Sequence, residues 1–271
     1  MQPVRLTKHH GLGNDFLVAL VESPDEARDY DANLARRVCH RTRGVGADGL
    51  IVGLRRPDVQ HDLSMTLYNA DGSRAEISGN GIRCLAQAEL MQRGVRECDL
   101  RIVTDAGLRV VAVRTTDDAH TVDACVGMGR VTERAQAPAP PPGHDIGKSA
   151  AADIGNPHWV VLVDDAWGVD LARLGPQFEH AGAGINVEFI APTRGAVDAI
   201  DLAVWERGVG ITEACGSGAG AAAFIAHRWG LVGPDVTVHM PGGSARVVLD
   251  GDDVTLIGPS VFIARVELPR D

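Results

Sequence analysis

Stretches of alternating and β-branched apolar residues recur along the chain and predict β-strands. Two further stretches, IRCLAQAELMQRG and AGAAAFIAHRWG, carry no such alternation and predict helices that end at Gly94 and Gly230, where glycine often terminates a helix. The predicted strands cover residues 16–22, 49–54, 63–69, 108–114, 158–164, 185–191, 199–206, 235–240, 245–250 and 261–268.

The segments that precede the two predicted helices share one sequence pattern. Residues 69–81 read NADGSRAEISGNG, and residues 206–218 read ERGVGITEACGSG. In both copies a Glu stands two positions before Ser78 or Cys215, and Gly-x-Gly follows directly. A polar residue, Asn69 or Glu206, stands nine positions before. The spacing of the two copies is close to half the chain, which indicates an internal duplication.

The duplication predicts an α+β fold of two pseudo-symmetric domains, each a curved, mainly antiparallel sheet wrapped around a central helix. We expect the N-terminal half to comprise residues 1–118 plus 262–271, and the C-terminal half residues 119–261. The proline-rich run 135–143 (AQAPAPPPG) predicts a loop inside the second half.

A residue placed just before Gly-x-Gly at a helix start faces unpaired backbone N–H groups and the positive end of the helix dipole. Such a position predicts a stabilised Cys215 thiolate and a cradle for a carboxylate. Two such helix starts facing each other would form a cleft between the domains. Within it, one acid/base group on each side of a bound α-carbon could invert its configuration.

Composition narrows the classes of function. The net charge of −10 argues against a nucleic-acid partner, and no apolar run approaches the roughly 18 residues of a membrane helix. The segment MQPVRLTKHHGLGNDF lacks the apolar region of a secretory signal, so we expect a cytoplasmic protein. Lysine occurs only at Lys8 and Lys148, neither in a recognisable context for a pyridoxal phosphate Schiff base. The histidine and cysteine spacings predict neither a metal site nor a disulfide framework.

The segment 44–49 (GVGADG) fits the pattern G-x-G-x-x-G. It follows a helical segment, Asn33–His40, and precedes a predicted strand, which is the reverse of the order in a dinucleotide-binding fingerprint. We therefore interpret it as a turn.

The ordered motifs resemble those of the diaminopimelate epimerase family over essentially the whole chain. The matching motifs are HHGLGNDF, RGVGADGL, NADGSRAEISGNGIRC, GNPHWV, INVEF, WERGVGITEACGSGAGAAA and GPSVFIARVEL. The resemblance implies mirrored α+β halves, no cofactor, no metal, a small-molecule amino-acid substrate and a homodimer. It implies interconversion of LL- and meso-diaminopimelate, on the route to lysine, by proton transfer from two sides.

Carried over position by position, the resemblance makes Cys215 one catalytic cysteine, with Glu206 and His158 as polar neighbours that assist proton movement. Position 49 is Gly, where some members have a substrate-contacting Gln. The positions that match substrate-binding residues of the family are Asn14, Asn69, Gly79, Asn80, Asn156, Asn186, Glu206, Arg207, Gly216 and Ser217.

Ser78 stands where the family usually has its other catalytic cysteine. A serine hydroxyl does not rest as an alkoxide near neutral pH, although it can donate a proton or act as a base if a neighbour relays that proton. Three explanations compete: a natural variant that still epimerises, a variant with an altered outcome, and an engineered Cys→Ser change. Serine is also a good helix N-cap, and capping is compatible with chemistry.

Two functions compete with diaminopimelate epimerisation. The first is a related racemase or dehydratase that acts on another amino acid, as in the proline racemase relatives, with a Ser78/Cys215 pair. The second is a non-catalytic protein that binds an amino acid and lost turnover together with its cysteine.

Overall fold

The structure is a computed structural model that describes residues 3–55, 60–144 and 146–269. The chain divides into two compact units: unit 1 is Met1–Val126 with Gly258–Asp271, and unit 2 is Gly127–Ile257. The boundaries expected after residues 118 and 261 lie just before β8 (Thr121–Arg130) and within β17 (Asp253–Leu268). Both of these strands continue from one unit into the other, so the chain has no loop at either division.

The strands of unit 1 form a closed ring. Strand β1 pairs antiparallel with β2, β2 parallel with β3, β3 antiparallel with β4, and β4 parallel with β6. Strands β6, β7 and β8 continue antiparallel, and β17 closes the ring against β8 and β1. The further elements of this unit are β1 (Val4–Gly11), β2 (Asn14–Val21), α1 (Pro24–Ala27), α2 (Ala32–Cys39), β3 (Gly49–Arg55), β4 (Leu63–Asn69), β5 (Arg74–Ala75), α3 (Gly79–Arg93), β6 (Glu97–Thr104) and β7 (Gly107–Thr115).

Unit 2 repeats the same order of pairings. Strand β10 pairs antiparallel with β11, β11 parallel with β12, β12 antiparallel with β13, and β13 parallel with β15. Strands β15, β16 and β17 continue antiparallel. The elements are β9 (Thr132–Glu133), β10 (Lys148–Asp153), β11 (Pro157–Leu162), α4 (Leu171–Ala181), β12 (Asn186–Pro192), β13 (Ala199–Glu206), β14 (Gly210–Ile211), α5 (Gly216–Arg228), β15 (Asp235–Met240) and β16 (Gly243–Asp250).

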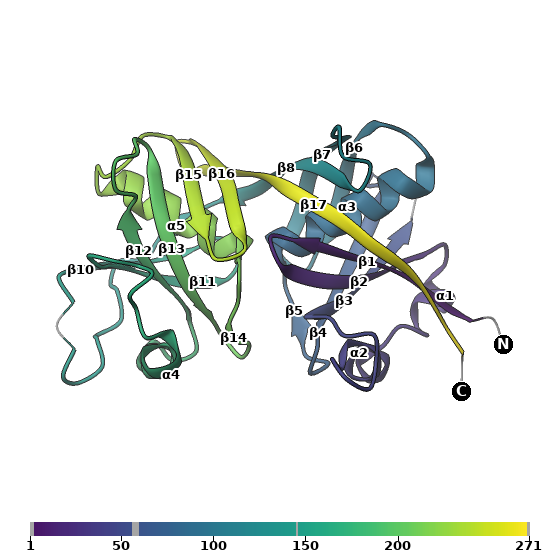
Figure 1. The fold of residues 1–271 in the computed structure, drawn as a ribbon, viewed down its shortest axis with the longest axis horizontal. Coiled ribbons are helices and arrows are strands. Elements are labelled where there is room, and N and C mark those ends of the chain that lie inside the picture. Colours follow the sequence, from purple (N-terminus) through teal and green to yellow (C-terminus); the bar gives the residue numbers. More distant parts are fainter. Residues whose placement is uncertain (1–2, 56–59, 145, 270–271) are drawn as a thin grey trace. The chain divides into compact units, whose positions relative to one another are not determined.

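One helix fills each curved sheet, as Figure 1 shows for α3 and α5. Helix α3 contacts β1, β2, β3, β6 and β7, and every residue from Gly79 to Leu90 is buried. Helix α5 contacts β10 to β13, β15 and β16, and every residue from Gly216 to Ala226 is buried. A helix buried on all sides needs no polar face, and α5 is accordingly rich in Ala and Gly. The predicted α+β class, with a curved sheet around a central helix in each half, is confirmed.

The predicted helix ends and the predicted turn are also confirmed. Gly94 caps α3 in the left-handed region with φ 67°, and Gly230 follows α5 with φ 74°. Residues 44–48 connect α2 to β3 and form neither a strand nor a helix. The segment 44–49 therefore has the helix-to-strand order that we interpreted as a turn.

Candidate active site

Ser78 is the N-cap of α3. Its backbone is extended, with φ −134° and ψ 122°, and its Oγ accepts a hydrogen bond from the Gly81 N–H at 3.0 Å. The Ser78 side chain is half-buried, whereas Gly79 and Asn80, which follow it, are buried. The first turn of α3 thus begins at a small polar side chain that lies next to its backbone N–H groups, as predicted from the sequence.

Asn80 is held at this helix start by a buried arginine. Arg83 donates to Asn80 Oδ1 at 2.7 Å, to the Gly79 carbonyl at 2.9 Å and to the Pro259 carbonyl at 3.2 Å. Burial lowers the pKa of the Arg83 guanidinium to about 10. The fixed Asn80 in turn donates from Nδ2 to Asn14 Oδ1 at 3.2 Å.

Asn14 is oriented by a second contact, from its Nδ2 to Asp48 Oδ2 at 2.8 Å. The same carboxylate oxygen accepts the Asp15 N–H at 3.0 Å, and Arg41 bridges Asp48 and Asp15 at 2.6 and 2.8 Å. The predicted residues Asn14, Asn80 and Ser78 therefore lie in one neighbourhood, and Asp48 is an orienting residue that the sequence did not single out.

Asn69 lies at the end of β4, where its Nδ2 donates to Ser73 Oγ at 3.0 Å. It is paired across the sheet with Gly49. A Cβ at Gly49 would lie 2.7 Å from the Tyr68 carbonyl oxygen, so the structure leaves little room for a side chain at this position.

Cys215 is the N-cap of α5, with φ −124° and ψ 115°. Its Sγ accepts the Gly218 N–H at 3.3 Å and lies 3.6 Å from Ser217 Oγ. The residue is 5% exposed. Both halves of the chain thus begin their central helix in the same way, one with a hydroxyl and the other with a thiol.

Glu206 faces Cys215. The half-buried Glu206 carboxylate accepts a hydrogen bond from the Thr212 hydroxyl at 2.5 Å. It also interacts electrostatically with the Cys215 thiol. Burial and the nearby Glu188 carboxylate raise the pKa of Glu206, although its hydrogen bonds oppose the shift.

The predicted stabilisation of the Cys215 thiolate is wrong for the ligand-free protein. Burial, followed by the negative charges of Glu206 and Glu188, raises the pKa of the thiol well above 9.0. The hydrogen bonds from Ser217 and the Gly218 N–H act in the opposite direction but are outweighed. The free protein therefore holds a neutral thiol at this helix start.

Asn156 and His158 are linked to Cys215 through Ser217. Asn156 Nδ2 donates to Ser217 Oγ at 3.3 Å, and Asn156 Oδ1 lies 3.0 Å from His158 Nε2. The other ring nitrogen, Nδ1, lies 2.6 Å from Glu188 Oε1. Glu188 is buried, and the sequence reasoning missed it as a site residue. A carboxylate inside the apolar stretch INVEFIA was the available signal.

Asn186 and Arg207 lie side by side at the ends of β12 and β13. Asn186 Oδ1 accepts the Arg207 N–H at 2.9 Å, and Asn186 Nδ2 donates to the Pro157 carbonyl at 3.0 Å. The Arg207 side chain is exposed. Unit 2 therefore brings Asn156, His158 and Ser217 into contact with the Cys215 region, with Asn186 and Arg207 on the adjoining strand ends.

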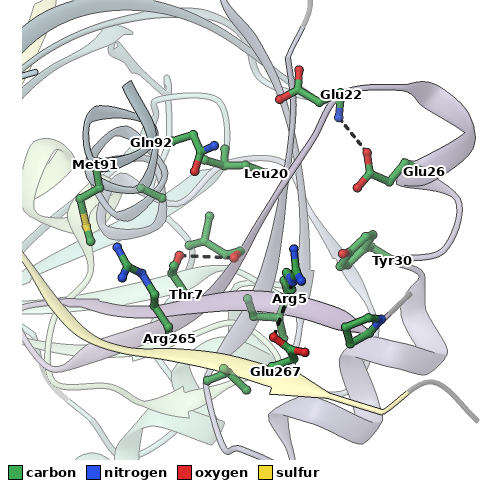
Figure 2. A pocket seen from close by; sticks show the side chains of 15 residues that line it. Arg5, Thr7, Leu20, Glu22, Glu26, Tyr30, Met91, Gln92, Arg265 and Glu267 are labelled. Carbon is green, nitrogen blue, oxygen red and sulfur yellow. Dashed lines mark hydrogen bonds and ion pairs between the residues drawn. The ribbon is translucent and has the colours of Figure 1, made fainter. Parts of the chain in front are cut away.

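A cavity of about 640 Å³ lies elsewhere in unit 1, between β1, β2, β17 and the later part of α3. Figure 2 shows Arg265, Met91 and Gln92 along it, with Arg5 and Glu267 as an ion pair at 3.6 Å. None of the predicted site residues lines it. We place the site at the starts of α3 and α5, because the predicted site residues Ser78 and Cys215 are the N-caps of these two central helices.

Residues 3–55, 60–144 and 146–269 contain no group of three or more His, Cys, Asp or Glu side chains placed to hold a metal ion. They also contain no helix of the length and apolarity that crossing a membrane requires.

The sequence and the fold were compared with known proteins. The sequence model of the family described as diaminopimelate epimerase matches residues 6–133 and 150–263. The diaminopimelate epimerase of Methanothermobacter thermautotrophicus is 37% identical, over 93% of this chain and 93% of that protein. The enzyme of the same name from Magnetococcus marinus is 40% identical, over 97% of this chain and 96% of that protein.

Solved structures share the fold at low sequence identity. A hydroxyproline epimerase from Agrobacterium vitis, with bound trans-4-hydroxy-L-proline, superposes with a TM-score of 0.73 at 16% identity, over 99% of this chain and 94% of that one. A phenazine biosynthesis protein of the PhzF family from Bacillus anthracis gives 0.73 at 14% identity, over the whole of both chains. At these identities the likeness concerns the fold alone.

Proposed function

Because the chain belongs to the diaminopimelate epimerase family, we propose that it is an isomerase that interconverts LL- and meso-diaminopimelate. The observation that carries the proposal is the pair of matched helix starts. Ser78 precedes Gly79-Asn80-Gly81 and Cys215 precedes Gly216-Ser217-Gly218, each as an N-cap. The N–H groups at a helix start suit an α-carboxylate, and two capping side chains suit the two faces of one α-carbon.

We assign the first proton transfer on the thiol side to Cys215 and Glu206. The thiol and the Glu206 carboxylate interact electrostatically, and both groups have raised pKa values in the ligand-free protein. A bound α-ammonium group brings positive charge that favours the ionised forms of both groups. Glu206 then takes the thiol proton, and the Cys215 thiolate takes the hydrogen from the substrate α-carbon.

Ser78 completes the inversion from the other face. Its hydroxyl gives its proton to the α-carbanion while solvent water returns a proton to Ser78 Oγ, so that no free alkoxide forms. In the reverse direction the hydroxyl passes the α-proton on to water, and the Cys215 thiol supplies the new one. This relay is slower than exchange with a thiol, so we expect a lower turnover than a cysteine at position 78 would give.

The remaining predicted residues bind the substrate in this proposal. Asn80 and Ser217 adjoin the α-carboxylate beside the backbone N–H groups, and His158 supports Asn156 on the thiol side. The residues assigned to the carboxylate cradle and to the distal amino and carboxylate groups are Asn14, Asn69, Gly79, Asn80, Asn156, Asn186, Glu206, Arg207, Gly216 and Ser217.

We also propose that the enzyme needs no cofactor, works in the cytoplasm on the route to lysine, and forms a homodimer. The two lysines of the chain have other contacts: Lys8 pairs with Asp15 at 2.9 Å, and Lys148 lies over the Trp229 ring at 5.0 Å. Both contacts leave a Schiff-base role without support.

Sedimentation tests the dimer, and an unchanged rate after exhaustive dialysis against a chelator tests the absence of a metal.

The substrate is tested by incubating the protein with LL-diaminopimelate and separating the stereoisomers. The proposal predicts conversion to a mixture with meso-diaminopimelate. Proline, hydroxyproline and other amino acids are run in parallel, because Ser78 and Gly49 also fit a racemase with another substrate. Turnover of one of these and not of diaminopimelate would favour that alternative. Thermal stabilisation by diaminopimelate without conversion would indicate a binding protein.

A further inference from the structure

A buried histidine and a buried glutamate form a pair behind the thiol side of the site. His158 on β11 and Glu188 on β12 are both 0% exposed, and the Nδ1 atom of the ring lies 2.6 Å from Glu188 Oε1. The other carboxylate oxygen, Oε2, is buried and has no hydrogen-bond partner among the residues that the structure describes, a feature that Glu89 of α3 shares. A buried carboxylate with one unsatisfied oxygen costs free energy, and Glu188 differs from Glu89 in lying next to the reactive sulfur.

The pair connects to the reactive sulfur through two side chains. His158 Nε2 faces Asn156 Oδ1 at 3.0 Å, Asn156 Nδ2 donates to Ser217 Oγ at 3.3 Å, and Ser217 Oγ lies 3.6 Å from Cys215 Sγ. Both ring nitrogens of His158 therefore face side-chain oxygens, Nδ1 that of Glu188 and Nε2 that of Asn156, so the ring is held from both sides.

Glu188 also lies directly against the first turn of α5. A Cβ added at Gly218 would come within 2.8 Å of Glu188 Oε1 and 3.2 Å of Cys215 Sγ. Glycine at 218 therefore lets the carboxylate approach the turn whose N–H group binds the sulfur. The carboxylate thus contacts the same turn that orients Cys215.

The duplicated unit shows what the fold looks like without this pair. In unit 1, Phe16 is paired with Gly49 between parallel strands, as His158 is paired with Asn186 in unit 2. Two residues after Gly49, Ile51 occupies the position in unit 1 that Glu188 occupies in unit 2. A Cβ added at Gly81 would lie 3.0 Å from Ile51 Cδ1, just as a Cβ at Gly218 would lie close to Glu188. The fold is thus built around Phe and Ile in one unit, so it does not itself require His and Glu.

We propose that Glu188 is a positioning residue of the thiol side: it fixes the His158 ring and, through Asn156 and Ser217, the direction of Cys215 Sγ. This inference rests on the proposed epimerase function and deepens it, because it makes the two sides of the site unequal. The thiol side has a charged support, whereas the serine side has Phe16 and Ile51 at the matching positions.

The charged side chains near Cys215 and the His158–Glu188 pair come from three strands. Glu188 on β12 and Glu206 on β13 both raise the pKa of Cys215, and Asp153 on β10 interacts with His158. Replacing Glu188 by Gln removes one of the two nearby negative charges while it keeps an oxygen that can accept from Nδ1. The variant therefore separates charge from shape.

The test compares Glu188→Gln with Glu89→Gln, a buried glutamate of α3 that pairs with Arg93 and Arg55 in unit 1. For Glu188→Gln we expect kcat to fall about tenfold or more with KM within about threefold, as loss of an aligned acid/base group predicts. We also expect alkylation of Cys215 to begin at lower pH, and the ¹⁵N chemical shifts of the His158 ring to change because its contact with a carboxylate is lost. Glu89→Gln should show none of these three changes.

The outcomes separate this inference from the proposed function. If the parent protein does not epimerise diaminopimelate, the proposed function fails, but the alkylation profile and the His158 spectrum still decide the role of Glu188. If Glu188→Gln matches Glu89→Gln in kcat, alkylation and ring spectrum, the inference is overturned.

A second variant covers the case in which Glu188→Gln does not fold. The double variant His158→Phe/Glu188→Ile copies the Phe16 and Ile51 pair of unit 1 and leaves no buried charge unpaired. We expect it to fold, to lose about a hundredfold in kcat, and to alkylate Cys215 at lower pH than the parent. Parental kcat in this variant would contradict the inference.

Discussion

Ser78 and Cys215 hold the same position in the two units: each is the N-cap of the central helix, and each accepts the N–H of the glycine three residues later. One cap is a hydroxyl and the other a thiol, and their surroundings differ. The Glu206 carboxylate raises the pKa of the Cys215 thiol, whereas the neutral Asn69 stands at the matching position of unit 1. The two positions therefore share their geometry and differ in acid/base chemistry.

Substitution of Ser78 separates capping from chemistry. Ser78→Ala removes a cap, which costs about 1 kcal/mol of stability, and it also removes the proposed proton relay. We expect epimerase kcat to fall about a hundredfold or more. Ser78→Cys should raise kcat above the parent value. Steady-state kinetics and urea unfolding measure the two effects.

The matched control is Ser23→Ala. Ser23 also caps a helix, with its Oγ accepting the Glu26 N–H at 3.2 Å, but it lies at α1. We expect Ser23→Ala to keep the parental kcat. If Ser78→Ala retained parental activity as well, Ser78 would be a cap alone.

Cys215 should react slowly with iodoacetamide at neutral pH, because burial and two carboxylates raise the pKa of its thiol well above 9.0 and only the thiolate is alkylated. Glu206→Gln removes one of those charges, so the pKa falls and alkylation of the Cys215 peptide speeds up at pH 8. Mass spectrometry of the digest gives the rate. Glu213→Gln, an exposed carboxylate two residues before Cys215, is the control. Equal rates in both variants would refute the proposed influence of Glu206.

Unit 1 should lose stability in acid because of His9. This fully buried ring lies 2.8 Å from Gln87 Oε1, and burial lowers its pKa from 6.5 to about 4, so the folded protein keeps it neutral. The unfolded chain takes up a proton at His9 below about pH 6.5. The neutral His9 ring therefore makes its full contribution to the free energy of unfolding above that pH. As the pH falls through about 4, this contribution is lost, and the free energy of unfolding decreases by roughly 3 kcal/mol.

Urea unfolding at pH 7 and pH 4.5 measures this loss. We expect His9→Gln to reduce the difference between the two conditions, because the titrating ring is gone. His10→Gln changes the neighbouring, half-buried histidine and should leave the difference as in the parent. The same pH dependence in all three proteins would show that other groups cause it.

Asp48 should matter for substrate affinity through Asn14. Asp48→Ala removes the oxygen that accepts a hydrogen bond from Asn14 Nδ2, so the Asn14 carboxamide loses its fixed orientation. We expect KM to rise about tenfold, whereas kcat should stay within about threefold of the parental value. Asp62→Ala is a close control, because both side chains are 31% exposed and both accept from an arginine and a backbone N–H. A KM that rises equally in both variants would show a general loss of structure instead.

The hydrophobic pattern predicted the fold well where strands are β-branched and alternate. It missed β1, β6 and β8, in which charged, cysteine or glycine residues interrupt the apolar alternation. It also missed β10, whose sequence KSAAAD is rich in alanine, a residue depleted in strands, and α4, which contains Pro176. These elements form because tertiary packing outweighs their weak local preferences.

The duplication located Ser78 and Cys215, because it preserves local spacing around each helix start. It could not reveal Glu188 as a partner of His158, since that contact depends on parallel pairing of β11 with β12 across an intervening helix. For the same reason, reasoning from the sequence predicted the wrong direction for the pKa shift of Cys215. The helix start is a local feature, whereas the two opposing carboxylates come from other strands.

Solvent labelling tests the two-sided proton transfer most directly. Parent protein and Cys215→Ala are incubated with LL-diaminopimelate in deuterated water, with Cys98→Ser as a control for loss of a thiol away from the helix start. The account predicts meso product with one deuterium, at the inverted α-carbon, from the parent and Cys98→Ser, and none from Cys215→Ala. Labelled meso product from Cys215→Ala at the parental rate would contradict it.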